Sequence, residues 1–318
     1  MFPTLSQLER AAEIIYQQMP PTPQYNWPML SQRIGVDVWL KHENHTPLGA
    51  FKVRGGLVYF DALSSELGDG VVCATRGNHG QSVAFAAGKH GIPVTIVVPH
   101  GNSMEKNAAM KSLGAKLVEF GQDFQEALEY AADLSGRNGM AMVPSFHPLL
   151  ITGVGTYSLE LFRAVDQLDV LYVPIGLGSG ICGAIAVKEA LGLETEIVGV
   201  VSSKARAYSE SIKCGRVIEL PATTEIADGM ACRRPNDDAL PFIIDGISRV
   251  VEVGDEQVKR AMRDIFQCTH NVAEGAGAAA VAAVTMDARR LEGKRAAAVL
   301  CGANVDRDVF SSVLAGTD

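Results

Sequence analysis

The amino-acid sequence predicts an α/β protein built on mostly parallel sheet that helices cover on both faces. Short apolar runs of strand type alternate with longer runs of helical periodicity along the chain, which is the pattern that parallel sheets produce. Glycine-containing loops join a strand to the following helix at residues 75–82 and 176–183. With 318 residues the chain is long enough for two domains or for one large domain.

Eight short apolar runs are the expected strands, because each is rich in small or branched apolar residues and is bounded by polar or turn residues. They are Val36–Leu40, Val71–Ala74, Val94–Val98, Lys116–Phe120, Ala141–Val143, Val170–Pro174, Ile197–Val201 and Ala296–Leu300. Helical periodicity fills stretches between them, such as Met104–Leu113 and Asp123–Leu134, and predicts an amphipathic helix at Leu5–Met19. No linker, repeat or shift in composition marks a domain boundary.

Composition and charge argue against several classes of protein. A net charge of −8 without a Lys/Arg cluster disfavours binding to nucleic acid. No uncharged apolar stretch reaches the ~18 residues that a membrane span needs, and the charged residues within Leu5–Met19 are not those of a signal peptide. The six cysteines form no Cys-x-x-Cys pair, which favours reduced, buried thiols in a cytoplasmic protein.

One lysine stands where a helix is expected to begin. Lys52 lies in the stretch Gly49–Gly56, directly after a loop that proline and glycine interrupt. The positive end of a helix disfavours an ammonium ion, so a neutral amine is easier to form there. A neutral lysine amine can form a Schiff base with an aldehyde. A surface lysine on a helix is the alternative if this motif is taken alone.

The two loops are the second and third motifs. Thr75-Arg76-Gly77-Asn78-His79-Gly80-Gln81-Ser82 follows the strand expected at Val71–Ala74, and Gly176-Leu177-Gly178-Ser179-Gly180 follows the one at Val170–Pro174. In a glycine-rich turn between a strand and a helix, backbone N–H groups can converge on a phosphate at the helix N-terminus. A turn with a purely structural role is the alternative.

Together the three motifs resemble the fold-type II pyridoxal-phosphate enzymes, and within them the branch of serine/threonine dehydratases and serine racemases. The likeness runs from Thr22-Pro23 to the stretch Cys301–Asp306. It implies two open, twisted, mostly parallel sheets as in the β subunit of tryptophan synthase. It also implies a smaller domain of residues 50–150 inserted into a larger one of residues 1–49 and 151–318, with the cofactor between them. Relatives are commonly dimers or tetramers, so a homodimer or homotetramer is expected. Because the sequence continues only briefly after the last motif, a C-terminal regulatory domain like that of some relatives is not expected.

The resemblance assigns most parts of a pyridoxal-phosphate site to residues of this chain. Lys52 is the amine that holds the cofactor and takes the α-proton, Phe51 packs beside the ring, and Asn78 binds O3′. The phosphate loop is Gly176, Leu177, Gly178, Ser179 and Gly180. Leu177 and Ser179 depart from the usual run of four glycines, although backbone N–H groups still serve there. An asparagine that only stabilises its own turn is the alternative for Asn78.

Two further residues are assigned at the cofactor ring. Cys301 corresponds to the residue that faces the pyridine nitrogen, and Glu274 to a glutamate near the ring. A neutral thiol does not keep that nitrogen protonated as a carboxylate does, so elimination is favoured over a long-lived carbanion. A packing cysteine and a solvated glutamate at a helix start are the alternatives.

The implied reaction is a dehydration. Lys52 removes the α-proton, the β-hydroxyl leaves with the cofactor phosphate as proton donor, and the product hydrolyses to a 2-oxo acid and ammonia. The substrate carboxylate is expected to bind the loop from Thr75 to Gln81, whose assigned residues are Thr75, Arg76, Gly77, His79 and Gln81. L-Threonine and L-serine are the default substrates.

Arg76 departs from the racemases, which hold a catalytic serine at this position. An arginine stays protonated and cannot act as the acid and base on the opposite face, so racemisation is not expected. Arg76 can instead pair with a second carboxylate, which would suit 3-hydroxyaspartate or another 3-hydroxy amino acid, such as a breakdown product of hydroxyectoine. A salt bridge to a neighbouring loop is the other interpretation.

The remaining alternatives concern other ligands. Relatives that bind Mg²⁺ or Ca²⁺ carry two carboxylates where this chain has Val201 and Ala207, so no metal is expected there. The literal G-x-G-x-x-G of Gly178–Gly183, with Lys204 and Arg206 after the next strand, leaves an NADP-dependent oxidoreductase open. A metabolite-binding protein without activity is a further possibility. Cysteine-synthase-type replacement is disfavoured because those relatives have Lys-Asp-Arg where this chain has Lys52-Val53-Arg54.

Overall fold

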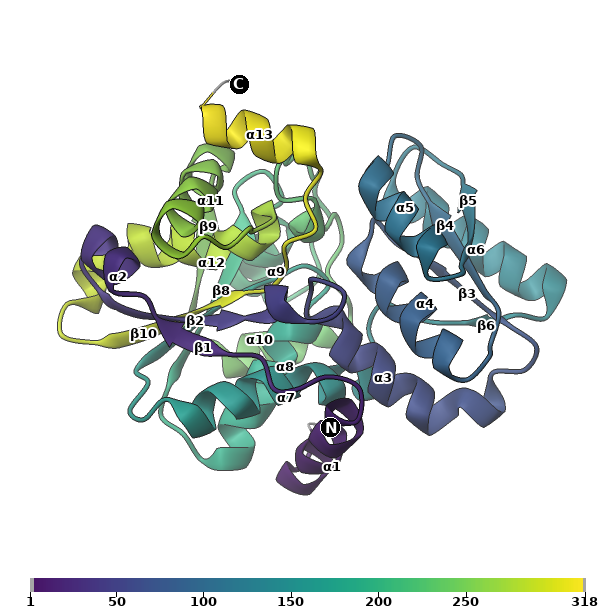
Figure 1. The fold of residues 1–318 in the computed structure, drawn as a ribbon, viewed down its shortest axis with the longest axis horizontal. Coiled ribbons are helices and arrows are strands. Elements are labelled where there is room, and N and C mark those ends of the chain that lie inside the picture. Colours follow the sequence, from purple (N-terminus) through teal and green to yellow (C-terminus); the bar gives the residue numbers. More distant parts are fainter. Residues whose placement is uncertain (1–2, 317–318) are drawn as a thin grey trace.

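The computed structural model describes residues 3–316 and contains two sheets, each flanked by helices (Figure 1). One sheet has six strands in the order β1-β2-β10-β7-β8-β9, and the other has four in the order β5-β4-β3-β6. Every neighbouring pair is parallel except β1 and β2. The expected α/β class with two mostly parallel sheets is therefore confirmed.

The strands are β1 Gln24–Asn26, β2 Asp37–His42, β3 Val71–Ala74, β4 Val94–Val98, β5 Lys116–Glu119, β6 Ala141–Met142, β7 Val170–Pro174, β8 Glu196–Ser202, β9 Arg249–Val253 and β10 Arg295–Leu300. The α-helices are α1 Leu5–Tyr16, α2 Pro28–Ile34, α3 Lys52–Leu63, α4 Asn78–Lys89, α5 Met104–Ser112, α6 Phe124–Asn138, α7 Pro148–Ala164, α8 Ser179–Leu191, α9 Ala207–Cys214, α10 Ala239–Gly246, α11 Asp255–Thr269, α12 Gly275–Met286 and α13 Arg307–Ala315. Short 3₁₀ turns include η1 Glu43–His45 and η3 Asp228–Met230.

The eight predicted strands are all present, with ends that differ by at most two residues. The sequence did not predict β1 or β9. β1 is a three-residue polar strand that pairs antiparallel at the edge of the sheet, and β9 carries Arg249 and Glu252 at the opposite edge. Neither has the apolar run by which the buried strands were found, because an edge strand is not covered on all sides.

Helix ends differ from the prediction for local reasons. α1 ends at Tyr16, before the predicted Met19, since Pro20 follows and disfavours helical geometry at the residue before it. α6 begins at Phe124 because Asp123 is its N-cap, whose side chain accepts from Glu126 N at 3.0 Å. None of the helices within residues 3–316 is long and apolar enough to cross a bilayer.

The helices around the six-stranded sheet form its two covering layers (Figure 1). α11 and α12 lie on one side of the strands, and α7, α8 and α10 on the other. α12 is composed almost entirely of Ala, Gly and Val and is buried along most of its length. The two β–α loops predicted as motifs lie at the carboxyl ends of β3 and β7, one in each sheet.

Helix α3 lies between the two sheets and packs on α7 and α4 (Figure 1). Glycines at the α3–α7 contact allow the backbones to meet. A Cβ at Gly153 would lie 2.4 Å from the carbonyl oxygen of Arg54, and one at Gly55 would lie 2.8 Å from that of Leu150. The first turns of α3 are therefore fixed against α7 by backbone contact.

A buried ion network holds the same part of α3. Arg54 is fully buried and donates to both carboxylate oxygens of Glu43 and of Glu160, at 2.6–3.0 Å. Lys41 of β2 donates to Glu160 at 2.6 Å, and Thr22 donates to Glu43 at 2.6 Å. The network joins the N-terminal segment, β2, α3 and α7, two residues from the start of α3.

Candidate active site

Lys52 and Ser179 are neighbours in space although 127 residues separate them in the sequence. Lys52 is the first residue of α3 and Ser179 the first of α8. Lys52 Nζ donates to Ser179 Oγ at 2.9 Å. The structure thus brings the predicted amine directly to the predicted phosphate loop.

Burial controls the ionisation of Lys52. The residue keeps some solvent contact, but protein atoms surround its ammonium group and lower its pKa to about 8. The sequence predicted a lowered pKa from the position of Lys52 at a helix start, and in the structure loss of hydration is the largest cause. A usable fraction of neutral amine therefore exists near neutral pH.

Phe51 lies beside this amine. Lys52 Nζ is 5.1 Å from the centroid of the Phe51 ring, whose edge meets Tyr157 with centroids 6.2 Å apart. The backbone of Phe51 is held as well, since its N–H donates to the Cys301 carbonyl at 3.0 Å. An apolar wall on one side of the amine is the result.

The glycine loop is a tight turn that leads directly into a helix. Gly178 has φ +103°, and a Cβ there would also lie 3.0 Å from Ala239 Cβ. The loop ends at the N-terminus of α8, whose first N–H groups have no partner within the helix. Leu177 leaves the loop intact because its carbonyl accepts from Tyr208 Oη at 2.9 Å.

Asn78 is the first residue of α4 and its amide has fixed polarity. Asn304 Nδ2 donates to the Leu48 carbonyl at 2.8 Å and to Asn78 Oδ1 at 2.8 Å. Asn78 Nδ2 then donates one hydrogen to Glu274 Oε1 at 2.7 Å. Because an amide nitrogen carries two hydrogens, one N–H of Asn78 remains for a ligand. The amide is tied to distant side chains, so a purely local turn role does not account for it.

Glu274 is buried, with 2% of its surface exposed, so it is not the solvated helix-start residue of the alternative interpretation. Burial raises its pKa to about 7, the nearby Asp228 adds to this effect, and Lys106 opposes it. Its Oε2 atom has no hydrogen-bond partner within residues 3–316. Burying such an atom costs free energy unless a nearby charge or a ligand compensates it.

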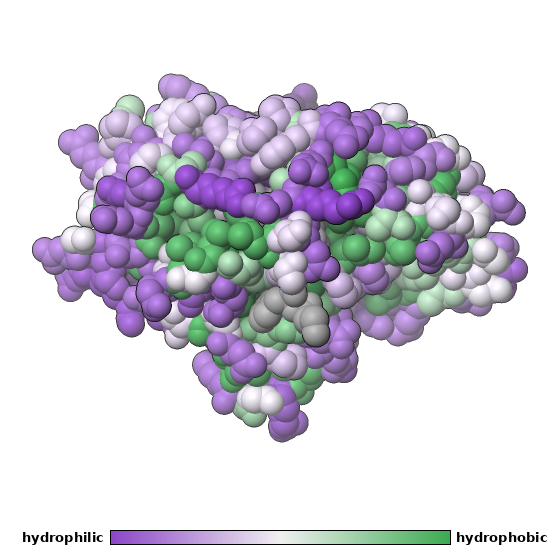
Figure 2. Space-filling view, turned by 90° about the horizontal axis from the view of Figure 1, so that it is seen from below, coloured by the Kyte–Doolittle hydropathy of each residue, from purple (hydrophilic) through white to green (hydrophobic). Residues whose placement is uncertain are grey.

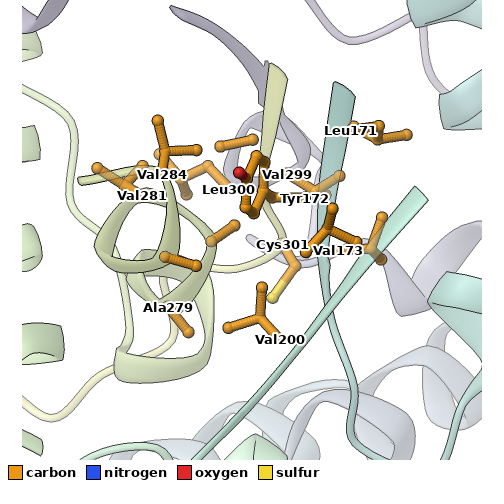
Figure 3. Close-up of a cluster of buried hydrophobic side chains, with 14 of the residues drawn as sticks. Leu171, Tyr172, Val173, Val200, Ala279, Val281, Val284, Val299, Leu300 and Cys301 are labelled. Carbon is orange, nitrogen blue, oxygen red and sulfur yellow. The ribbon is translucent and has the colours of Figure 1, made fainter. Parts of the chain in front are cut away.

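Cys301 directly follows the last residue of β10 (Figure 3). Its side chain lies among Val173, Val200 and Ala279 in the buried cluster that the figure shows. Burial and the nearby Glu274 raise the pKa of the thiol well above its ordinary value. The thiol is therefore neutral at any physiological pH.

The loop after β3 combines structural and unpaired polar groups. Thr75 Oγ1 accepts from Gly77 N at 2.9 Å and from Gly80 N at 3.3 Å, so its oxygen shapes the loop. His79 Nε2 and Gln81 Nε2 are buried without a hydrogen-bond partner in the described part of the chain. Burial, with a further contribution from Lys52, lowers the pKa of His79 to about 3, so its ring is neutral.

Arg76 is half-buried on the same loop. It has no ion pair with any carboxylate between residues 3 and 316. The salt bridge to a neighbouring loop that was one interpretation of Arg76 is therefore not formed. A partly covered guanidinium remains free to meet an anion.

The positions considered for other ligands have different surroundings. Val201 and Ala207 are buried and apolar and offer no ligand oxygen, and residues 3–316 contain no group of three or more His, Cys, Asp or Glu side chains that could hold a metal. Lys204 pairs with Asp255 at 3.0 Å and Arg206 with Glu252 at 3.0 Å. A 2′-phosphate would have to compete with these carboxylates.

Three residues of the site were missed by the sequence analysis. Lys106 of α5 lies 2.7 Å from Asp228 Oδ2 and 3.7 Å from Glu274 Oε2, measured from Nζ. The other two missed residues are Asp228 and Asn304. Asn304 lies within the last motif of the sequence, and this position could have indicated it. Lys106 had none, because one lysine on an amphipathic helix looks like any solvated lysine.

The comparison with known proteins gives one family. Residues 15–302 match the family described as pyridoxal-phosphate dependent enzyme. The biosynthetic L-threonine dehydratase IlvA of Haemophilus influenzae is 32% identical over 296 residues, which are 92% of this chain and 58% of that protein. The chain thus spans little more than half the length of that relative. The L-threo-3-hydroxyaspartate ammonia-lyase of Saccharomyces cerevisiae is 28% identical over 318 residues, which are 99% of this chain and 98% of that protein.

Solved structures agree with this result. The structure of maize serine racemase superposes with a TM-score of 0.91 at 26% identity, covering 99% of this chain and 98% of the maize protein. The similarity therefore extends over both sheets and over the site between them.

Proposed function

Because the chain belongs to the family of pyridoxal-phosphate dependent enzymes, we propose that it removes water from a 3-hydroxy amino acid and releases a 2-oxo acid and ammonia. L-Threonine is the first candidate substrate and L-serine the second. The observation that carries the proposal is the contact of Lys52 Nζ with Ser179 Oγ at 2.9 Å. It unites an amine that can bond an aldehyde with a helix N-terminus that can bind a phosphate.

The residues fit pyridoxal phosphate. The low pKa of Lys52 supplies a neutral amine, and the turn at Gly178 supplies backbone N–H groups at the start of α8. The N–H of Asn78 that remains after its bond to Glu274 supplies a donor for the ring hydroxyl. Each donor set matches one functional group of the cofactor, so we assign Lys52, Phe51, Asn78, Glu274, Cys301 and residues 176–180 to its binding.

Lys52 is the base in the proposed reaction. Pyridoxal phosphate, when bound, supplies an electron sink that makes the α-proton of an amino acid removable. Lys52 Nζ would hold the cofactor, and as a free amine in this poorly hydrated site it would accept that proton. The Phe51 ring, 5.1 Å away, excludes water from this side of the amine.

Cys301 and Arg76 direct the outcome toward elimination. The neutral thiol of Cys301 would not keep the ring nitrogen of a bound cofactor protonated, which would favour loss of the β-hydroxyl as water. Arg76 stays protonated and cannot return a proton from the opposite face. We therefore propose a lyase and not a racemase.

The loop after β3 is proposed to bind the substrate carboxylate. Gln81 Nε2 is a buried donor without a partner in the described residues, and Thr75 keeps its hydroxyl hydrogen although its oxygen accepts two backbone N–H groups. Gly77 and His79 complete the loop. A carboxylate would satisfy the unpaired donors and so offset the cost of burying them.

A second candidate substrate is 3-hydroxyaspartate. Arg76 is half-buried, without an ion pair in residues 3–316, and lies two residues before Asn78. A guanidinium binds a carboxylate through two parallel hydrogen bonds, so a substrate with a second carboxylate would give Arg76 a partner. The similarity to the yeast L-threo-3-hydroxyaspartate ammonia-lyase supports this candidate.

We also propose how the chain is organised. Residues 50–150 would form a small domain around the four-stranded sheet, and residues 1–49 with 151–318 a large one, in keeping with the strand content of the two sheets.

Apolar patches among hydrophilic residues on the face seen in Figure 2 support a homodimer or homotetramer. Five buried, unpaired cysteines suit the reducing cytoplasm. Light scattering on the purified holoenzyme would determine the number of subunits.

Assaying 2-oxo acid and ammonia release by the holoenzyme across a panel of 3-hydroxy amino acids tests the reaction. The panel contains L-threonine, L-serine and the isomers of 3-hydroxyaspartate, with L-alanine as a substrate that cannot lose water. Equal release of both products from at least one 3-hydroxy amino acid, and none from L-alanine, is expected. A holoenzyme that binds the cofactor but turns over no member of the panel would refute the proposal.

A further inference from the structure

Lys106 connects the two sheets at the edge of the site. It lies on α5, which packs on α4 and β5 of the four-stranded sheet. Its Nζ is 2.7 Å from Asp228 Oδ2 and 3.7 Å from Glu274 Oε2, and both carboxylates belong to segments beside the six-stranded sheet. Only 7% of Lys106 is exposed. A lysine this buried needs paired charge, and here both partners come from the other sheet's side.

The stem of Lys106 lies against the loop that carries Asn78. A Cβ at Gly77 would lie 2.5 Å from Lys106 Cδ, so this close approach requires glycine. The start of α5 is tied to the other side as well. Ser103 caps the helix by accepting from Lys106 N at 3.0 Å and also donates to Asp306, and Arg307 N donates to Glu105 at 2.9 Å.

The charge of Lys106 favours the ionised form of Glu274, against the effect of burial. The groups that face Glu274 are Lys106 from α5, Asp228 from η3, Asn78 from α4 and the Cys301 thiol. Among them Lys106 is the cation, while Asp228 repels a second negative charge. Without Lys106, a buried carboxylate beside Asp228 would take up a proton.

The ionised form of Glu274 is the one that suits Asn78. A carboxylate can only accept hydrogen bonds, so Glu274 Oε1 must take a hydrogen from Asn78 Nδ2. The second Asn78 N–H then has one direction left, into the site. A protonated Glu274 can donate instead, and the amide of Asn78 is then held in this orientation by Asn304 alone.

We propose that Lys106 is a positioning residue for the cofactor site: it favours the ionised form of Glu274 beside Asn78, and it does so only when α5 lies against the segments of Asp228 and Glu274. The alignment of the Asn78 donor is thereby linked to the approach of the two sheets. This inference rests on the proposed function, because it assigns Asn78 to the bound cofactor.

The test compares the wild-type holoenzyme with Lys106→Met, Glu274→Gln and the double variant. Lys111→Met is the matched control, since Lys111 is an exposed lysine on the same helix. Two quantities are measured. One is the dissociation constant of pyridoxal phosphate from titration of the apoenzyme, and the other is the midpoint of the pH-dependent change in the absorption spectrum of the bound cofactor. Melting temperatures establish that each variant is folded, and Lys106→Gln replaces Lys106→Met if the latter does not fold.

Lys106→Met is expected to weaken cofactor binding about tenfold, the equivalent of one lost charge-assisted hydrogen bond. It should also raise the spectral midpoint by about 1 pH unit, because a nearby cation no longer favours the carboxylate. In the Glu274→Gln background the same substitution should change the dissociation constant less than about twofold. Lys111→Met should leave both quantities unchanged.

The inference is overturned if Lys106→Met leaves both quantities at the wild-type values. It is equally overturned if the substitution has the same effect with and without Glu274, since Lys106 would then act only as a structural tie. Neither measurement needs turnover. A holoenzyme that fails on every 3-hydroxy amino acid but shows the expected binding pattern would refute the proposed reaction and leave the role of Lys106 supported.

Discussion

Asn78 Nδ2 lies 2.7 Å from Glu274 Oε1, although 196 residues separate them. Asn78 begins α4 beside the four-stranded sheet, and Glu274 precedes α12 beside the six-stranded sheet. The donor proposed for the cofactor ring is therefore oriented by a carboxylate from the other sheet. Asn304 fixes the amide from its second side, through Asn78 Oδ1 at 2.8 Å.

Asn304→Ala should weaken pyridoxal phosphate binding. It removes the donor that holds Asn78 Oδ1, so the amide can rotate and the proposed N–H is no longer aimed. A loss of about 1 kcal/mol, or roughly fivefold in the dissociation constant, is expected. Asn102→Ala is the control, since Asn102 donates to Asn107 at 2.7 Å within α5's own segment. Equal affinities for both variants would show that Asn304 does not orient the site.

Lys52→Ala should abolish both the absorbance of the bound cofactor and the release of ammonia. In the wild-type apoenzyme, the rate of cofactor uptake should rise about tenfold per pH unit below pH 8 and level off above it. The reason is that the Lys52 amine has a pKa of about 8 and reacts with an aldehyde only when neutral. Stopped-flow absorbance measures this rate. A rate that does not change with pH below 8, or turnover by Lys52→Ala, would contradict the assignment.

Gly178→Ala should destabilise the protein and weaken cofactor binding. An alanine cannot adopt φ +103° without strain, and its Cβ would press on Ala239. The expected cost is roughly 1–3 kcal/mol in the free energy of unfolding. Gly88→Ala is the control, because no atom lies within 4 Å of its Cβ position and its helix should be unchanged or slightly more stable. Urea unfolding of both variants decides, and equal stability would rule out strain at Gly178.

Arg54→Met should lower the free energy of unfolding by about 3–5 kcal/mol at neutral pH, because it leaves Glu43 and Glu160 buried without their main partner. Arg163→Met, which removes an exposed pair with Glu9, should cost less than about 1 kcal/mol. Unfolding of both variants by urea measures the difference. A small effect of Arg54→Met would mean that the network is not a main support of α3.

The same network predicts the pH dependence of stability. Burial raises the pKa of Glu160, but the nearby Arg54 and Lys41 lower it more, so that it lies below its ordinary value. A carboxyl with a lowered pKa stabilises the fold above its unfolded pKa of about 4.3, and this contribution is lost as pH falls through the folded value. The difference in the free energy of unfolding between the wild type and Arg54→Met should therefore become smaller as the pH is lowered. A gap that stays constant down to acid unfolding would speak against this origin.

Arg76→Ala should change substrate preference and not the reaction. If Arg76 binds a second carboxylate, kcat/KM for 3-hydroxyaspartate should fall by about 100-fold, the value of a charged bidentate hydrogen bond of roughly 3 kcal/mol. The value for L-threonine should change much less. Steady-state kinetics with both substrates provide the measurement. An equal fall in kcat/KM for both substrates would mean that Arg76 only stabilises the loop. Unchanged values for both would show that Arg76 does not contact the substrate.

The sequence alone determined the strands that are buried on both faces and the motifs that follow them. β3, β4 and β7 have the predicted ends because a covered strand must be a continuous apolar run. Lys52, the Asn78 loop and the Gly178 loop could be recognised because each lies where a glycine-containing loop leads into an expected helix, and because the three motifs together resemble one family. The sequence did not predict the edge strands β1 and β9, because a strand that is only partly covered by other elements does not need a continuous apolar run.

Tertiary structure alone decided how these motifs meet and in which state of charge. Lys52 has a lowered pKa because it is buried, which residue order does not reveal. Glu274 could be a solvated helix start or a buried carboxyl, and only packing against Asn78, Asp228 and Lys106 made it the latter. Hydration and Coulomb interaction depend on distance through space, and the fold brings together residues more than a hundred positions apart.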